Sequence, residues 1–132
     1  MVEISITDQF TPLLNEMALS GEDLSPVLGQ IGELMVDSVH ENFDWQGRPE
    51  LWEPRQDDNY WPILMHTGNL LHSIHYEVEG GFSVSVGSDV PYAGFHQQGT
   101  SKMPARPFLL IQDQDTNEIE NLLVQHFHLE GF

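Results

Sequence analysis

The sequence predicts an α+β fold, in which an antiparallel β-sheet is covered by α-helices on one face. Apolar residues recur every three or four positions from Leu24 to Phe43, which is typical of a long amphipathic helix. Two short stretches, 74–78 and 82–86, instead alternate apolar and polar residues, which is typical of half-buried strands. The expected order is strand, helix, helix, long loop, strand, strand, a possible third strand, and helix. A chain of 132 residues is expected to form one domain, residues 1–132.

The first strand and the first two helices have clear local signals. Val2, Ile4 and Ile6 alternate with polar residues, which predicts a short strand. Thr11-Pro12 and Ser25-Pro26 each resemble an N-cap followed by proline at the first helical position. The first of these helices is expected to end at Ser20-Gly21.

Two glycines, Gly29 and Gly32, lie inside the long helix. Each costs a helix about 0.5–1 kcal/mol relative to alanine. We therefore expect them to allow close approach of a neighbouring backbone.

Residues 44–62 lack periodicity and contain several prolines, yet they include Trp45, Trp52, Tyr60 and Trp61. These aromatic residues leave two alternatives, since the loop can pack on its own domain or become ordered on a partner. We expect a mobile loop in the isolated protein.

The next elements are a turn and a hairpin. Thr67-Gly68-Asn69-Leu70 predicts a capped single turn of helix before the first hairpin strand. A three-residue loop, 79–81, would pair Val78 with Phe82 and Tyr76 with Val84, which places both apolar rows on one face. A two-residue loop would place them on opposite faces.

Residues 91–110 combine three prolines and two glycines with aromatic side chains, so this segment is predicted to be a structured functional loop. Its end, residues 106–111, can form the third strand. Asp115 with Glu118 resembles a capping box for the last helix. The expected buried stripe of that helix is Ile119, Leu122, Leu123, His126 and Phe127.

The chain is strongly acidic, with 21 Asp and Glu against four Lys and Arg and a formal charge of −17. This excess disfavours binding to nucleic-acid phosphates. It fits a solubilising surface, a surface that lies near DNA without adhering to it, or a protein mimic of DNA. There are no cysteines, no membrane-spanning apolar run and no signal peptide, so the cytoplasm is the expected compartment.

No residue pattern predicts catalysis, and the chain is not expected to be an enzyme. His72 with His75 and His126 with His128 lack the spacing of a zinc signature, and no GxSxG motif is present. We expect no catalytic residue, no cofactor and no metal.

A set of short motifs between residues 63 and 110 resembles the phage virion morphogenesis family, the tail-completion family of Mu-like and P2-like phages and prophages. In order, they are Thr67-Gly68-Asn69-Leu70, Ser73-Ile74, Val86-Gly87-Ser88, Val90-Pro91-Tyr92-Ala93, His96-Gln97, Gly99-Thr100 and Met103-Pro104-Ala105-Arg106-Pro107-Phe108-Leu109. The resemblance implies a structural neck protein that forms a ring at the head-proximal end of the tail and enables head–tail joining. It implies a location in the virion tail or neck, and in the host bacterial cytoplasm during assembly.

This resemblance implies function through surfaces. Expected partners are further copies of the chain in a ring, although the isolated subunit can be monomeric, and other tail or neck proteins, with no sequence-specific nucleic acid and no membrane. Lys102 and Arg106 could dock on an acidic neighbour, or Arg106 could pair within its own domain. The competing function is an acidic DNA mimic that inhibits a DNA-binding host enzyme. The expected interface residues are Trp52, Trp61, Tyr92, His96, Gln97, Lys102, Met103, Arg106 and Phe108.

Overall fold

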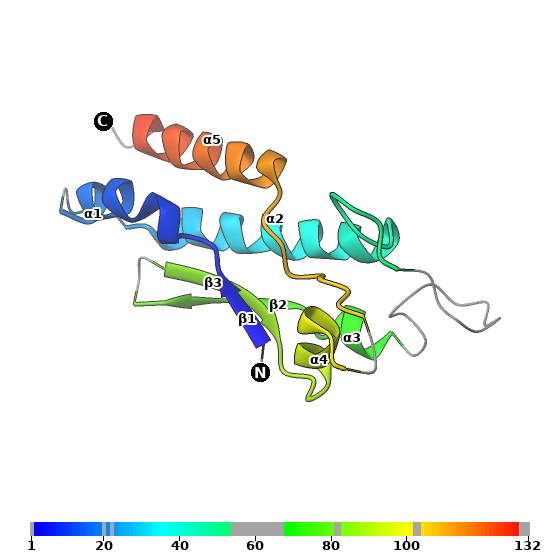
Figure 1. The fold of residues 1–132 in the computed structure, drawn as a ribbon. Coiled ribbons are helices and arrows are strands. Elements are labelled where there is room, and N and C mark those ends of the chain that lie inside the picture. Colours follow the sequence, from blue (N-terminus) through cyan, green and yellow to red (C-terminus); the bar gives the residue numbers. More distant parts are fainter. Residues whose placement is uncertain are drawn as a thin grey trace.

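The computed structural model describes residues 2–19, 21, 23–53, 68–80, 83–101 and 104–129. These residues form an α+β fold, as predicted (Figure 1). The elements in chain order are β1 (Val2–Ser5), the 3₁₀ turn η1 (Asp8–Phe10), α1 (Thr11–Leu19), α2 (Ser25–Asp44), α3 (Asn69–His72), β2 (His75–Glu79), β3 (Ser83–Ser88), α4 (Ala93–Gln98) and α5 (Asp113–Leu129).

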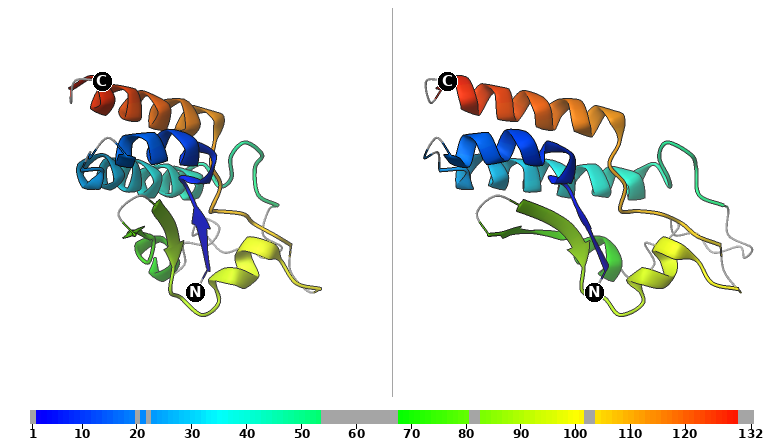
Figure 2. Two further views of the ribbon diagram at one scale, coloured as in Figure 1. Left: turned by 90° about the vertical axis from the view of Figure 1, so that its left-hand side faces the viewer. Right: turned by 60° about the vertical axis from the view of Figure 1, so that its left-hand side comes forward.

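The three-stranded sheet has the order β1-β3-β2, and both neighbouring pairs are antiparallel. Figure 2 shows α1, α2 and α5 together in a layer over one face of this sheet. The short helices α3 and α4 lie outside that layer, near one end of the sheet. The predicted layering of helices over one sheet face is therefore confirmed.

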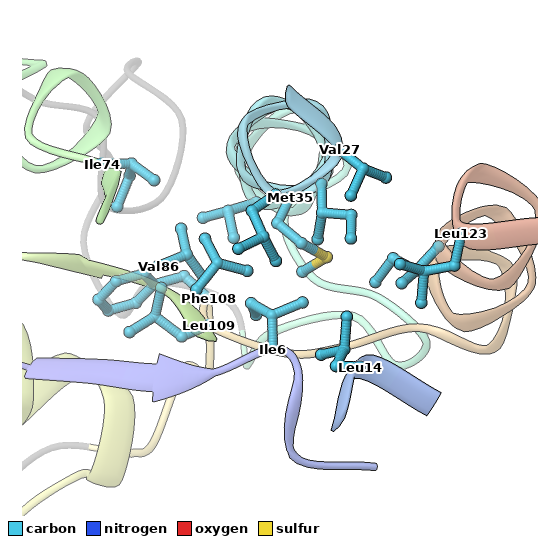
Figure 3. Close-up of a cluster of buried hydrophobic side chains, with 14 of the residues drawn as sticks. Ile6, Leu14, Val27, Met35, Ile74, Val86, Phe108, Leu109 and Leu123 are labelled. Carbon is cyan, nitrogen blue, oxygen red and sulfur yellow. The ribbon is translucent and has the colours of Figure 1, made fainter. Parts of the chain in front are cut away.

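The core is centred on α2, whose apolar stripe faces the sheet on one side and α5 on another. Leu28, Ile31, Met35, Val39 and Phe43 of this helix are fully buried. They meet buried residues of the other elements, among them Ile6, Leu14, Val86, Phe108 and Leu123 (Figure 3). The spacing of three and four residues along α2 therefore marks its buried face as predicted.

Gly32 of α2 allows a close approach, but the neighbour is a side chain and not a backbone. A Cβ atom at Gly32 would lie 2.2 Å from Cδ2 of Tyr76 on β2. At Gly29 the nearest atom is the Tyr76 hydroxyl oxygen, at 3.8 Å, which is ordinary contact. The expectation of backbone contact was wrong because the Tyr76 ring fills the space between helix and sheet.

The β2–β3 hairpin confirms the odd loop but not its position. Glu79 pairs with Ser83 and Val78 with Val84, so residues 80–82 separate the strands instead of 79–81. A loop of three residues keeps the apolar rows on one face, as predicted. Because the loop begins one residue later than predicted, Glu79 belongs to the strand and pairs with Ser83. Gly80, at φ +63°, is then the first residue of the loop.

The helix starts also differ from the predicted caps. Thr11 follows η1 and its hydroxyl donates to the Asp8 carbonyl, whereas the Asp23 carboxylate accepts from the Ser25 N–H. This bond to Ser25 lowers the pKa of Asp23. In α5 the Asp115 carboxylate accepts from the Gln112 N–H at 2.9 Å. Asp115 therefore takes the acidic position of the capping box, which the sequence assigned to Glu118.

Candidate assembly surface

The predicted loop at residues 91–110 contains a short helix, α4, which the sequence did not predict. After α4 the chain turns at Gly99, where φ is +77°, and later runs back past the helix as an extended segment, residues 104–112. A Cβ at Gly99 would lie 2.7 Å from the Ala105 nitrogen. Glycine at this turn therefore lets the returning segment pass close to the end of α4.

The Gln97 side chain holds the returning segment against α4. Its Oε1 accepts from the N–H groups of Phe108 and Leu109, both at 3.0 Å, and its Nε2 donates to the Leu109 carbonyl at 2.9 Å. The Arg106 N–H also donates to the His96 carbonyl at 2.7 Å. One amide side chain thus provides hydrogen bonds that a strand would obtain from a neighbouring strand.

Residues 106–111 form no strand, so the optional third strand after the hairpin was wrong. Two more side chains form hydrogen bonds to main-chain carbonyl groups of this segment. Asn42 Nδ2 donates to the Phe108 carbonyl at 2.7 Å, and Trp52 Nε1 donates to the Pro107 carbonyl at 2.9 Å. Pro107 itself has no N–H to give a sheet. The extended segment is therefore fixed by side chains of α2, α4 and the loop after α2.

An aromatic cluster anchors the first part of the loop after α2. The Phe43 ring lies 5.7 Å from the Trp52 ring, nearly perpendicular to it, and 5.6 Å from the Phe108 ring. Trp52 is only 6% exposed. Of the two alternatives for this loop, the part up to residue 53 is anchored on its own domain through Trp52. Residues 54–62 lie outside the described residues, and their mobility stays a prediction.

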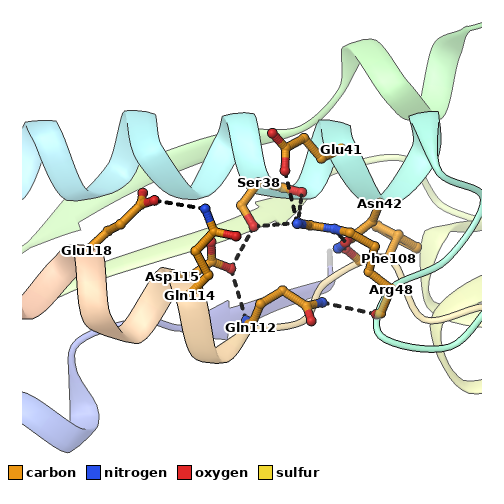
Figure 4. Close-up of polar contacts among 9 residues, drawn as sticks. All are labelled: Ser38, Glu41, Asn42, Arg48, Phe108, Gln112, Gln114, Asp115 and Glu118. Atoms are coloured by element: carbon orange, nitrogen blue, oxygen red, sulfur yellow. Dashed lines mark hydrogen bonds and ion pairs between the residues drawn. The ribbon is translucent and has the colours of Figure 1, made fainter.

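A polar network around Arg48 joins the loop, α2 and α5 (Figure 4). Its guanidinium donates to Asn42 Oδ1 at 2.8 Å and to the carbonyl and hydroxyl oxygens of Ser38, and lies 2.9 Å from Glu41 Oε2. The Ser38 hydroxyl in turn donates to Asp115 at 2.6 Å. Sequence reasoning missed this network, because no local pattern links Arg48 to Asp115.

Gln112 closes the same network. Its Nε2 donates to the Arg48 carbonyl at 3.0 Å, while its N–H bonds to Asp115. The loop after α2 therefore also holds the end of the returning segment, through the Arg48 carbonyl.

Arg106 forms contacts within its own domain. Its Nε and Nη2 donate to the Glu53 carbonyl at 3.1 and 2.9 Å. Arg106 thus forms intramolecular bonds, and its contact with a neighbouring subunit stays a prediction. Nearby, burial and then the Arg106 charge lower the pKa of His96, whose Nδ1 is buried without a hydrogen-bond partner among the described residues.

The family model for the phage virion morphogenesis family matches residues 5–128. The chain belongs to this family. It is 31% identical to Mu-like prophage FluMu G protein 2 of Haemophilus influenzae, over 97% of this chain and 96% of that protein. It is also 28% identical to FluMu G protein 1 of the same organism, over 90% and 86% of the two chains. No solved structure gives a significant match. The family supports a role in phage virion assembly, with other virion proteins as partners.

On this virion morphogenesis protein, α4 presents apolar side chains to solvent. Tyr92, the N-cap residue just before α4, is 40% exposed, and Phe95 within the helix is 59% exposed. Their spacing of three residues places them on the same side of this end of the helix. We call these two residues the α4 surface. Sequence reasoning did not propose Phe95 as an interface residue, because a helix of six residues is too short to show a recognisable periodicity. Leu51 and Trp45, in the loop after α2, are also exposed.

Besides Arg106, the predicted interface residues fall into three groups. Phe108 and Trp52 are buried, so they shape the surface and offer a partner no exposed face in this conformation. Gln97 is half-buried and held by main-chain bonds, and its contact with a partner stays a prediction. Tyr92 is exposed, and its ring meets the half-buried His96 edge-on at 5.7 Å. Contact of these two with a partner stays a prediction. Trp61, Lys102 and Met103 lie outside the described residues.

Among the described residues, three acidic side chains lie close enough together to share one metal ion, which sequence spacing did not reveal. Glu3, Glu77 and Glu79, from β1 and β2, have carboxylate oxygens within 4.8 Å of one another and are exposed. His75 lies beside them, with Nε2 3.5 Å from Glu77 and Nδ1 3.0 Å from the Ser73 carbonyl. This carbonyl, and then Asp89 and Glu77, raise the pKa of His75. Carboxylates so exposed are common without a metal.

Within the described ranges, no helix has the length and apolarity required to cross a membrane.

Proposed function

We propose that this chain is a tail-completion protein, which assembles as a ring at the head-proximal end of a phage tail and enables head–tail joining. The observation that carries the proposal is the family match over residues 5–128, together with similarity to a Mu-like prophage G protein along nearly the whole chain. Function of this kind depends on surfaces, and catalysis is not part of the proposal.

The charge of the chain fits a ring through which DNA passes. A formal charge of −17 on each subunit would repel phosphate from the lumen. The same charge makes the subunits repel one another, so the ring requires apolar burial that offsets this repulsion. Tyr92 and Phe95 of the α4 surface supply exposed aromatic area, the kind of side chain that dominates protein interfaces.

The first test is genetic. Deleting the gene from an active phage or prophage should leave separate heads and tails in electron micrographs of the lysate, and a plasmid copy should restore joined particles. Joined particles in normal numbers without the gene would refute the proposal.

The second test concerns the α4 surface. Electron microscopy of the purified protein at high concentration, or after addition of purified tails, should show rings of fixed diameter. Replacing Tyr92 and Phe95 by serine should abolish them, whereas Val124→Ser on α5, which is 43% exposed, is the matched control. Rings formed by the Tyr92/Phe95 variant would exclude this surface. If the protein stays monomeric at every concentration and displaces DNA from a host enzyme, the DNA-mimic function would be supported instead.

A further inference from the structure

Strand β2 lies at one edge of the sheet, and the pairing shows which of its main-chain groups face outward. The Ile6 N–H donates to the Val84 carbonyl at 2.9 Å, so Val84 directs its main-chain groups toward the β1 side. Because these directions alternate along a strand, residues 83, 85 and 87 of β3 face β2. Their partners are residues 79, 77 and 75. Tyr76 and Val78 therefore direct their N–H and C=O groups away from the sheet, and no described strand pairs with them.

A groove of about 410 Å³ runs beside this free edge. It is lined by Val36, Ile74 and Tyr76, which form an apolar floor, and by Glu33, Asp37 and His75. Helix α5 packs on a different side of α2, where Ser38 meets Asp115. The groove is therefore separate from the α2–α5 contact and lies next to the outward-facing groups of β2.

Carboxylates flank the free edge on both faces of the sheet. Glu33 and Asp37 are exposed on the groove side. Glu77 and Glu79 are exposed on the other face, with Glu3 beside them. A strand added to β2 would thus have negative charge on both sides, and it would require cationic side chains to neutralise it.

A second copy of this chain is a poor occupant of the edge. It would bring 21 acidic and four basic residues to an acidic surface. Of the four, Arg48 and Arg106 already bond inside the fold. Charged residues on an edge strand discourage pairing between identical chains, while they attract a segment of opposite charge.

We propose that the β2 edge binds an extended segment of another virion protein, rich in Lys or Arg, by strand addition. Its main chain pairs with the outward groups of Tyr76 and Val78, and its alternate side chains lie over the groove floor or beside Glu77 and Glu79. The virion source of the segment rests on the proposed assembly function. The test below concerns β2, so its failure can be distinguished from failure of the ring test, which concerns α4.

The first experiment measures binding of an end-capped peptide of alternating lysine and valine, KVKVKVK, to the full chain by calorimetry. Two control peptides separate the contributions. In one, the lysines are replaced by glutamate, and in the other the valine nitrogens are methylated, which keeps the charge but blocks strand pairing. Only the parent peptide should bind tightly, and it should slow amide hydrogen exchange at Tyr76 and Val78. Equal binding of the methylated peptide, or unchanged exchange at these amides, would overturn the proposal.

The second experiment changes the edge itself. Glu77→Lys with Glu79→Lys should weaken the parent peptide by about tenfold or more, which corresponds to about 1.4 kcal/mol. Asp44→Lys with Glu120→Lys makes the same change in net charge at exposed sites on α2 and α5, and should alter binding by less than about threefold. Similar losses in the two variants would show attraction by net charge alone and overturn the edge site.

A third variant, Val78→Pro, removes an outward N–H without removing a bond to β3. Circular dichroism establishes whether it folds. If it does, it should bind the peptide about tenfold more weakly. Unchanged affinity in the folded Val78→Pro variant would contradict strand addition, and the Glu77/Glu79 pair tests the site independently.

Discussion

Alanine substitution at two glycines of the same helix should change stability in opposite directions. At Gly29 a methyl group would meet only the Tyr76 hydroxyl, at 3.8 Å, so the gain in helix propensity of about 1 kcal/mol should appear almost in full. At Gly32 the same methyl would lie 2.2 Å from Cδ2 and 2.4 Å from Cγ of the Tyr76 ring. These atoms lie near the Tyr76 backbone, so the contact is relieved only if the ring leaves its packed rotamer or β2 moves.

The magnitude follows from those distances. Inserting a methyl group into a filled core costs about 1–3 kcal/mol, and this contact lies at or above the upper end of that range. After the propensity gain is subtracted, Gly32→Ala should destabilise the protein by about 2 kcal/mol. The two variants should therefore differ by roughly 3 kcal/mol, although the substitution and the helix are the same.

The assay is urea unfolding followed by tryptophan fluorescence and circular dichroism, with the midpoint and slope compared for each variant. Tyr76→Val provides the internal control, because Gly32→Ala should cost much less once the ring is absent, and the double-mutant cycle measures that coupling. Equal stability of Gly29→Ala and Gly32→Ala, or no coupling to residue 76, would refute the packing of the Tyr76 ring against Gly32.

Three further predictions concern the returning segment and its supports. Gln97→Met should destabilise by about 2–4 kcal/mol because it leaves main-chain groups unpaired, while the exposed neighbour Gln98→Met should stay within about 0.5 kcal/mol in the same assay. Arg48→Met should cost about 3 kcal/mol, whereas Glu41→Gln, at its exposed partner, should cost less than about 1 kcal/mol; equal losses would refute the network. The pKa of His96 is lowered in the folded protein, so as pH falls this imidazole is protonated in the unfolded chain before it is protonated in the folded one. The free energy of unfolding should therefore decrease as pH drops through and below 6.5. His96→Gln should flatten this part of the curve of unfolding free energy against pH, and identical curves would contradict the buried, neutral state.

Local patterns were sufficient for the regular elements that carry the core. The three-and-four spacing of α2 repeats over 20 residues and marks its buried face even if single positions are atypical. The alternation in β3 marks Val84 and Val86 as buried, whereas in β2 Tyr76 is only half-buried and Val78 is exposed. The same parity argument correctly excluded an even hairpin loop. It could not fix which three residues form that loop, because moving the loop by one residue on each strand preserves the parity.

The segment at residues 91–110 was recognisable as structured from its prolines, glycines and aromatic residues, but its conformation was not. Residues 106–111 have the composition of a strand, and only the tertiary structure shows that Gln97, Asn42 and Trp52 occupy their main-chain groups. These bonds join residues up to 66 positions apart. No local pattern encodes such a pairing, since each bond depends on one side chain in one place.

By itself, the sequence determined the fold class, the buried face of the long helix and of the second hairpin strand, the acidic surface, and the resemblance to a virion morphogenesis family that the family match confirmed. The tertiary structure alone decided that Phe108 and Trp52 support the fold, that Phe95 is exposed, and that β2 is an edge of the sheet formed by the described residues, beside a groove. The physical reason is that periodicity and charge are sums over many residues. Exposure, hydrogen-bond partners and strand edges instead depend on which distant segments meet.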